Sequence, residues 1–255
     1  MTSQTGAAAK PCRNLPGDAN VEPADGEGHA QVAVQRQGQA GAPSKHCGSM
    51  PITDDEIREK YLERAIRELN SVTRELQSCE HCPRGNLMPV LGSGHPQADV
   101  MLLKYAPMPS EIEEGVAFYG RAGGALMKSL KRLSIDPLAV YGTLCVKCPL
   151  SDPALAEGWA GISICMGRVV EEIAIVQPKI VVVMGPDALA ALSEMEIPLG
   201  RELAPRLGEI QRLTPMIDAL YVPNIDDSLD ETDSKREFWA AFRVLGDWYA
   251  AQPPY

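Results

Sequence analysis

Apolar residues recur every three or four positions between residues 53 and 78, which is the spacing of one face of an α-helix. The positions are Ile57, Tyr61, Leu62, Ala65, Ile66, Leu69, Val72 and Leu76. Thr53 precedes the run and Glu56 follows three residues later, the pattern of a capping box at a helix N-terminus. The pattern predicts a helix that begins at Thr53 and ends near Ser78.

Short apolar runs follow this helix, and each precedes a segment of helical period. The predicted strands are Val100 to Leu103, Val140 to Val146, Ile180 to Met184 and the weaker run Leu220 to Val222. The predicted helices are Gly124 to Leu133, Ile162 to Val176, Pro186 to Leu192 and Glu231 to Ala250. This alternation indicates an α/β fold with a mostly parallel sheet and helices on both faces. Ligands of such sheets bind in the loops that follow the strands.

Residues 1 to 50 show neither period and are rich in Gly, Ala, Gln and Pro. Such composition predicts a disordered N-terminal tail. Residues 51 to 255 are then expected to form one folded domain that includes the N-terminal helix.

The formal net charge of -10 bears on partners and location. It offers no basic stripe for nucleic acid, so DNA is a possible but disfavoured partner. No apolar stretch reaches the ~20 residues that span a bilayer. The N-terminus also lacks the plan of a signal peptide. We therefore expect a cytoplasmic monomer without membrane contact.

Four of the seven cysteines have a spacing that indicates a metal site. Cys79 and Cys82 form a C-x-x-C pair, and Cys148 and Cys165 follow far along the chain. An odd number of cysteines without a secretion signal fits reduced thiols better than disulfides. Four thiolates complete either an iron-sulfur cluster or a zinc site.

Two alternatives to an iron-sulfur cluster at these four residues remain open. Zinc would use Cys145 and Cys148 as a second C-x-x-C pair, which leaves Cys165 without a role. The cysteines would otherwise be unligated and structural. Cys145 is expected to be a small buried hydrophobic residue when it is not a ligand.

From Cys79 to Leu229 the chain resembles the iron-sulfur type of uracil-DNA glycosylase, family 4 of the uracil-DNA glycosylase superfamily. The C-x-x-C pair matches, and residues 115–123, G-V-A-F-Y-G-R-A-G, match the pattern G-x-P-F-x-G-R-A-G. Lys147-Cys148 and Cys165 match the later ligands. The resemblance implies a three-layer α/β/α fold with a short central sheet. It also implies a structural 4Fe-4S cluster held by the four cysteines.

The resemblance further implies DNA base-excision chemistry in a pocket with an aromatic ring. Phe118 stands at the position of the ring that stacks on a flipped base. Gly120 and Arg121 open a helix with close backbone approach and a cation, which suits a phosphate contact. A simple helix-entry loop has the same sequence signature.

Three polar residues of the family pattern are replaced in this chain. Tyr105 stands where the pattern G-E-x-P-G has Glu. Leu144 stands where the family has the uracil-reading Asn, just before the V-K-C segment. Val222 stands where H-P-S has His. Leu144 cannot hydrogen-bond a base edge, and Val222 cannot donate to the departing base. Tyr105 is a poor general base near pH 7, although it is able to position a water or touch the base.

The loop after the last strand carries several carboxylates, which would repel a DNA backbone. They are equally typical of an acidic first turn, with Asp227 or Ser228 as the cap of the last helix. The sequence therefore predicts a uracil-DNA glycosylase-like iron-sulfur protein with divergent or weakened base excision. The alternative is a non-catalytic member that binds nucleic acid, a nucleotide or a protein.

Overall fold

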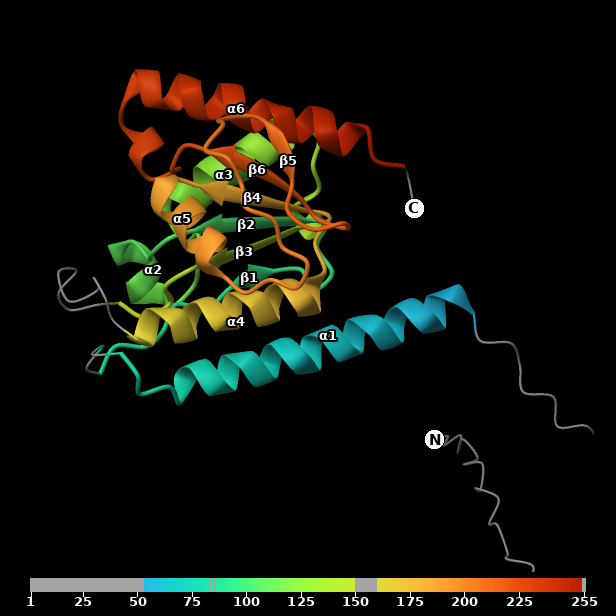
Figure 1. The fold of residues 1–255 in the computed structure, drawn as a ribbon, viewed down its shortest axis with the longest axis vertical. Coiled ribbons are helices and arrows are strands. Elements are labelled where there is room, and N and C mark those ends of the chain that lie inside the picture. The colour runs from blue at the N-terminus through green and yellow to red at the C-terminus, as the bar shows by residue number, and fades with distance from the viewer. Residues whose placement is uncertain (1–52, 83, 85, 150–159, 254–255) are drawn as a thin grey trace, which may run out of the picture. The chain divides into compact units, whose positions relative to one another are not determined.

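The computed structural model of the chain describes residues 53–82, 84, 86–149 and 160–253 (Figure 1). The predicted tail, residues 1–50, lies outside the described residues, as does segment 150–159.

A six-stranded sheet lies at the centre of the described structure, in the order β1-β3-β2-β4-β6-β5. The strands are β1 (Ser93–Gly94), β2 (Val100–Lys104), β3 (Val140–Leu144), β4 (Ile180–Met184), β5 (Ile210–Arg212) and β6 (Asp218–Val222). The four inner strands run parallel, and the edge strands β1 and β5 pair antiparallel with their neighbours. The sheet is thus short and mostly parallel, as predicted.

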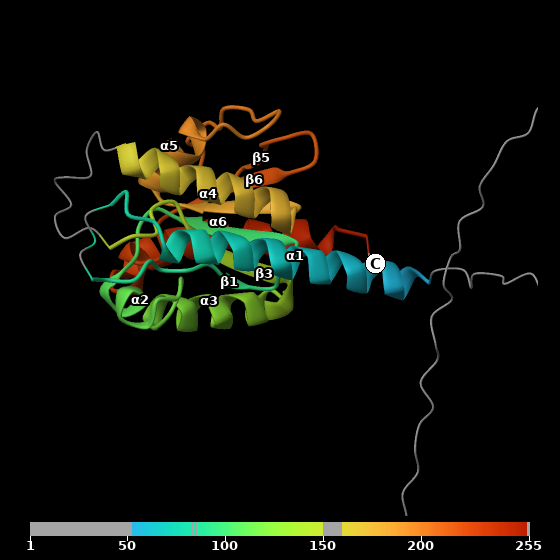
Figure 2. The ribbon, with the colours of Figure 1, turned by 90° about the horizontal axis from the view of Figure 1, so that it is seen from below.

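Helices cover both faces of this sheet (Figures 1 and 2). They are α1 (Asp54–Gln77), α2 (Pro109–Glu114), α3 (Arg121–Arg132), α4 (Ala160–Val176), α5 (Pro186–Glu194) and α6 (Thr232–Ala250). One apolar cluster joins the sheet to α4 and α5, and a second joins its other face to α3 and α6. The predicted three-layer α/β/α arrangement is therefore confirmed. None of the described helices has the length and apolar character to cross a bilayer.

Alternation along the strands explains the two clusters. Met101 and Leu103 of β2 point into the first cluster, and Val100 and Leu102 point into the second. All five residues of β2 are buried, including Lys104 at its end. A strand that is buried on both faces needs a partner for any charge that it carries.

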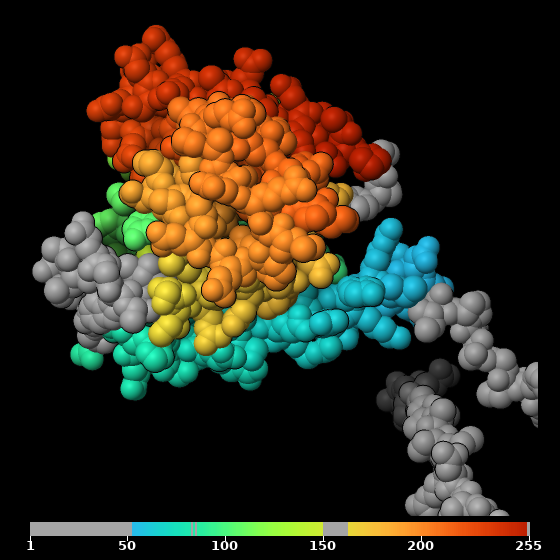
Figure 3. Space-filling view, viewed as in Figure 1, coloured from blue at the N-terminus to red at the C-terminus, as the bar shows by residue number. Residues whose placement is uncertain are grey.

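Helix α1 begins as the sequence predicts. The Thr53 side chain accepts a hydrogen bond from the Glu56 backbone, and the Glu56 carboxylate accepts one from the Thr53 backbone. Only Ala65, Val72 and Leu76 are buried along this helix. α1 packs alongside α4 and does not lie along the sheet (Figures 1 and 3).

Several predicted boundaries shift in the structure. β3 ends at Leu144 rather than Val146, and α3 begins at Arg121 rather than Gly124. The prediction of Asp227 or Ser228 as the cap of the last helix is wrong. Residues Asp227–Leu229 form a separate 3-10 turn, and Glu231 precedes α6 without a side-chain cap.

Candidate functional site

The carboxyl ends of the four parallel strands form one row. Lys104 of β2 lies in register with Leu144 of β3 and with Met184 of β4. Met184 lies in register with Val222 of β6. Two side-chain assemblies stand at this edge of the sheet, one of thiols and one around Lys104.

Three thiols from separate segments converge in the first assembly. Cys82 follows α1, Cys148 follows β3, and Cys165 lies in α4. Their sulfur atoms all lie within 4.8 Å of one another. Cys148 and Cys165 are buried, and the described cysteines are free of disulfides. An all-thiol donor set suits an iron-sulfur cluster or zinc, so this is a possible three-cysteine metal site.

Contact among the thiols changes their acidity. A hydrogen bond from the Cys148 thiol lowers the pKa of Cys165 to about 6, and backbone N–H groups of Lys147 and Cys148 act in the same direction. The same thiol contact and burial raise the pKa of Cys148. Burial raises the pKa of Cys82. The thiolate is the form that binds metal, and the thiol contact favours it at Cys165 over Cys148.

Cys79, the fourth predicted ligand, lies outside this group of three. Its backbone N–H donates to the Leu76 carbonyl at 3.2 Å, directly after α1. The Arg84 guanidinium donates to the carbonyl oxygens of Cys79 and Gln77, each at 2.9 Å. These hydrogen bonds fix the backbone at Cys79, which precedes Cys82 by three residues.

Cys145 is buried in the apolar cluster beneath α4, as the sequence predicts. Burial raises the pKa of its thiol to about 12. Cys145 is not among the converging thiols, whereas Cys165 is. In the described structure, the converging thiols therefore include Cys165 in place of the Cys145 of the alternative zinc set, while Cys82 and Cys148 belong to both sets.

A buried ion pair between Lys147 and Glu172 stabilises the segments that carry the thiols. The Lys147 ammonium donates to Glu172 at 2.8 Å and to the Thr143 hydroxyl at 2.6 Å. Thr143 and Tyr141 also donate to Glu172. Because Glu172 and Cys165 both belong to α4, the pair fixes this helix against the segment that carries Cys148.

The second assembly is a buried network around Lys104. Its ammonium lies 2.7 Å from a carboxylate oxygen of Glu111 and 2.7 Å from one of Asp226. The side chains of Lys104 and Glu111 are 2% and 1% exposed, and that of Asp226 is 9% exposed. A lysine at the end of a buried strand is thus neutralised by the loop after β2 and the loop after β6.

Glu111 also organises the loop after β2. It accepts hydrogen bonds from the backbone N–H groups of Met108 and Phe118. The first of these bonds caps the N-terminus of α2, and the second fixes the aromatic loop. Both carboxylate oxygens of Glu111 are therefore engaged by the protein itself.

The Phe118 ring stands beside this network. The Lys104 ammonium lies 5.5 Å from the ring centroid, a cation–π distance. Phe118 has a φ of 59°, and a Cβ added at Gly123 would lie 1.8 Å from the Phe118 carbonyl oxygen. Only glycine fits that close approach, which explains the second glycine of the G-R-A-G segment. The ring itself packs over Gly142 of β3.

Two of the three residues at the replaced family positions are apolar, and the third, Tyr105, packs against the first apolar cluster. Leu144 is fully buried against Ala117 and Phe118, and Val222 is fully buried in the second cluster. Tyr105 packs against the first cluster, on the face of α4 and α5, and burial raises its pKa. Phe118 packs against the other two clusters, and a role for Tyr105 in positioning a water or touching the base stays a prediction.

Gly120 and Arg121 open α3 as predicted. Gly120 precedes the helix with a φ of +84°, which favours glycine. The exposed Arg121 guanidinium forms an ion pair with Asp230. This contact lowers the pKa of the Asp230 carboxyl through a hydrogen bond and its charge.

The carboxylates of the loop after β6 are less repulsive than the sequence indicates. Asp226 is paired with Lys104, and Asp230 with Arg121. Sequence reasoning treated both as free negative charge because their partners lie far away along the chain. It also missed the Lys104 network, although a lysine that ends a buried strand was a visible signal.

The fold and the site define a class of protein: an α/β/α protein with converging thiols at the carboxyl edge of its sheet. The sequence pattern of the Uracil DNA glycosylase superfamily matches residues 91–243, more than half of the chain. The chain therefore belongs to the uracil-DNA glycosylase superfamily.

Relatives in this superfamily are type-4 uracil-DNA glycosylases. That of Pyrobaculum aerophilum is 30% identical over 150 residues, which are 56% of this chain and 72% of the relative. That of Sulfurisphaera tokodaii is 34% identical over 125 residues, 46% of this chain and 54% of the relative. That of Archaeoglobus fulgidus is 23% identical over 199 residues, 74% and 97% of the two chains.

Proposed function

We propose that this chain is an iron-sulfur protein of the DNA base-excision repair type, whose excision of uracil is weak or redirected to another base. Membership of the superfamily supports the DNA substrate. The Lys104–Glu111–Asp226 network carries the second part of the proposal, because it fills the strand ends beside Phe118.

A flipped base is read by hydrogen bonds to its edge. Glu111 has both oxygens engaged by Lys104, Met108 and Phe118. Leu144 has no polar group to offer. A base edge without a partner loses about 1–3 kcal/mol, so discrimination in favour of uracil is weakened.

Lys104 supplies a positive charge, which Val222, at the position of the family's His, does not supply. Its ammonium lies 5.5 Å from the Phe118 ring centroid and would stabilise negative charge on a departing base if that base took the place of Asp226, the more exposed of its two carboxylate partners. Such a donor favours a base whose acceptor atom reaches toward the end of β2. This arrangement supports redirected excision over complete loss of activity.

The second candidate function is non-catalytic binding through the same fold. The observation that favours it is that the Lys104 network is closed, with side chains 9% exposed or less and every charge paired. A site whose polar groups satisfy one another is able to persist without a substrate.

The proposed cofactor is a 4Fe-4S cluster held by Cys82, Cys148 and Cys165, with Cys79 as the fourth ligand. When bound, it supplies a structural tie between the end of α1, the end of β3 and α4. Zinc is the alternative for the same thiols. Visible absorbance with iron and sulfide in stoichiometric amounts supports the cluster, and a colourless protein that contains zinc contradicts it.

The test of activity uses oligonucleotides that carry one uracil, hypoxanthine or xanthine, followed by alkaline cleavage of abasic sites. We expect weak uracil cleavage by the native chain. The double variant Leu144→Asn/Val222→His restores the two pattern residues and should increase uracil cleavage. Uracil excision by the native chain at the rate of a type-4 enzyme would overturn the proposal. No excision of any base would support the non-catalytic function.

A further inference from the structure

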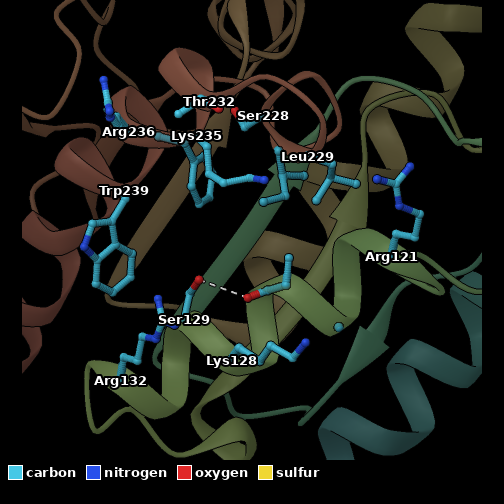
Figure 4. A pocket seen from close by; sticks show the side chains of 14 residues that line it. Arg121, Lys128, Ser129, Arg132, Ser228, Leu229, Thr232, Lys235, Arg236 and Trp239 are labelled. Carbon is cyan, nitrogen blue, oxygen red and sulfur yellow. Dashed lines mark hydrogen bonds between the residues drawn. The ribbon is translucent and has the colours of Figure 1, made fainter.

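A groove between α3 and α6 lies outside the assemblies at the strand ends (Figure 4). Its volume is about 730 Å³, and its walls come from α3, the segment 225–229 and α6. Five cationic side chains line it, namely Arg121, Lys128, Arg132, Lys235 and Arg236. No carboxylate is among its lining residues.

Part of this positive charge is unneutralised in the described structure. Arg121 pairs with Asp230, and Arg236 pairs with Asp233. Lys128 and Lys235 form no ion pair within 4.0 Å among the described residues, although the charge of Lys235 contributes to the lowered pKa of Asp230. The chain as a whole has a formal charge of -10, so the positive charge of this groove is opposite in sign to the net charge of the protein. Clefts lined by one sign of charge attract ligands of the opposite sign.

The groove also has an aromatic and apolar wall. Trp239 and Phe238 line it from α6, and Leu229 lines it from the preceding turn. The Arg132 guanidinium lies 5.7 Å from the Trp239 ring centroid. Aromatic faces beside cations are the combination that binds single-stranded nucleic acid, with bases on the rings and phosphates on the cations. A duplex keeps its bases stacked on one another and cannot use the ring.

The position of the groove fits such a strand. Arg121 belongs both to the groove and to the loop of Phe118, and Leu229 lies in the loop that also carries Asp226. The groove therefore adjoins both the segment that follows Phe118 and the segment that follows β6.

We propose that the groove between α3 and α6 binds a single-stranded segment of nucleic acid, with phosphates at Lys128 and Lys235 and a base against Trp239. This inference goes beyond base excision, because it requires neither a lesion nor a metal. An acidic protein segment is the other polyanion with suitable charge, but it has no flat rings to match Trp239.

The test is fluorescence anisotropy of the full chain with a labelled 12-nucleotide oligo-dT, at several salt concentrations. The variant Lys128→Ala/Lys235→Ala should bind at least tenfold more weakly at low salt. Its salt slope should fall by about 1.4, since each lost phosphate contact on a single strand accounts for ~0.7. Trp239→Leu should weaken binding about 5- to 100-fold with little change in slope.

The matched control is Lys131→Ala/Arg243→Ala, which removes two exposed cations from the same helices but outside the groove. It should bind oligo-dT like the native chain. Equal losses in control and groove variants, or no binding at low salt, would overturn the proposal. Tighter binding of a labelled oligo-glutamate peptide than of oligo-dT would replace it with a protein partner. The probe contains no lesion, so either result is independent of the excision assay.

Discussion

Two buried lysines at the carboxyl edge of the sheet have opposite relations to the family pattern. Lys147 belongs to the matched K-C segment, and Lys104 stands where the pattern G-E-x-P-G begins with glycine. Both side chains are 2% exposed or less, and both are ion-paired. Lys147 fixes α4 beside the thiols, whereas Lys104 joins two loops and places its ammonium 5.5 Å from the Phe118 ring centroid. The matched lysine thus stabilises the fold, and the replacement is the one that we propose alters base excision.

The largest expected effect concerns the thiols that Lys147 supports. Cys165→Ala should abolish bound metal, because it removes one of three converging sulfur atoms. Cys145→Ala is the matched control and should retain the metal. Metal content of the purified variants, by elemental analysis, checks this pair. Loss of metal from Cys145→Ala alone would contradict the assignment of Cys165 and favour the alternative zinc set.

Lys147→Met should cost about 3–5 kcal/mol of unfolding free energy, since it leaves Glu172 buried without its cation. The hydroxyls of Thr143 and Tyr141 remain as donors but carry no charge. Urea denaturation measures the loss, with the exposed Lys131→Met as control. A loss below about 1 kcal/mol would mean that Glu172 is solvated or neutral without Lys147.

Lys104→Met should cost less, about 2–3 kcal/mol, because it removes the hydrogen bond to Asp226, and a hydrogen bond to a charged group contributes about 1.5–3 kcal/mol, while Glu111 keeps two backbone donors. Asp226 is also more exposed than Glu172. The double variant Lys104→Met/Asp226→Asn should recover part of the loss. The comparison of the two lysines fails if Lys104→Met proves more destabilising than Lys147→Met in the same urea series.

Gly142→Ala has the smallest expected effect, about 1–3 kcal/mol from overpacking. The added Cβ would lie 2.5 Å from the Phe118 ring, which must move. The variant therefore separates the ring from the Lys104 network without changing a charge. Thermal denaturation measures the cost, and Gly124→Ala, which meets no atom within 4 Å, is the control. An equal cost in both variants would show that Phe118 yields freely.

The sequence predicts the elements well where burial alone determines them. The run Ile180 to Met184 coincides with β4, because a fully buried strand is apolar throughout. The edge strands β1 and β5 were missed, since two or three half-exposed residues carry no period and depend on their partners. α2 was missed because its six residues interrupt a loop.

The candidate site divides in the same way. Cys82, Cys148 and Cys165 were visible from spacing and resemblance, and the structure brings them together. The Lys104–Asp226 pair spans 122 residues, so only the fold reveals it. Asp226 was read as free charge because no local pattern connects it with β2.

Helix α1 has a consequence for the dynamics of the chain. Its buried residues begin at Ala65, and its ion pair to α4 is made by Glu75, near the end that leads to Cys79 and Cys82. Amide hydrogens in the first turns should therefore exchange rapidly with solvent, and those after Val72 slowly.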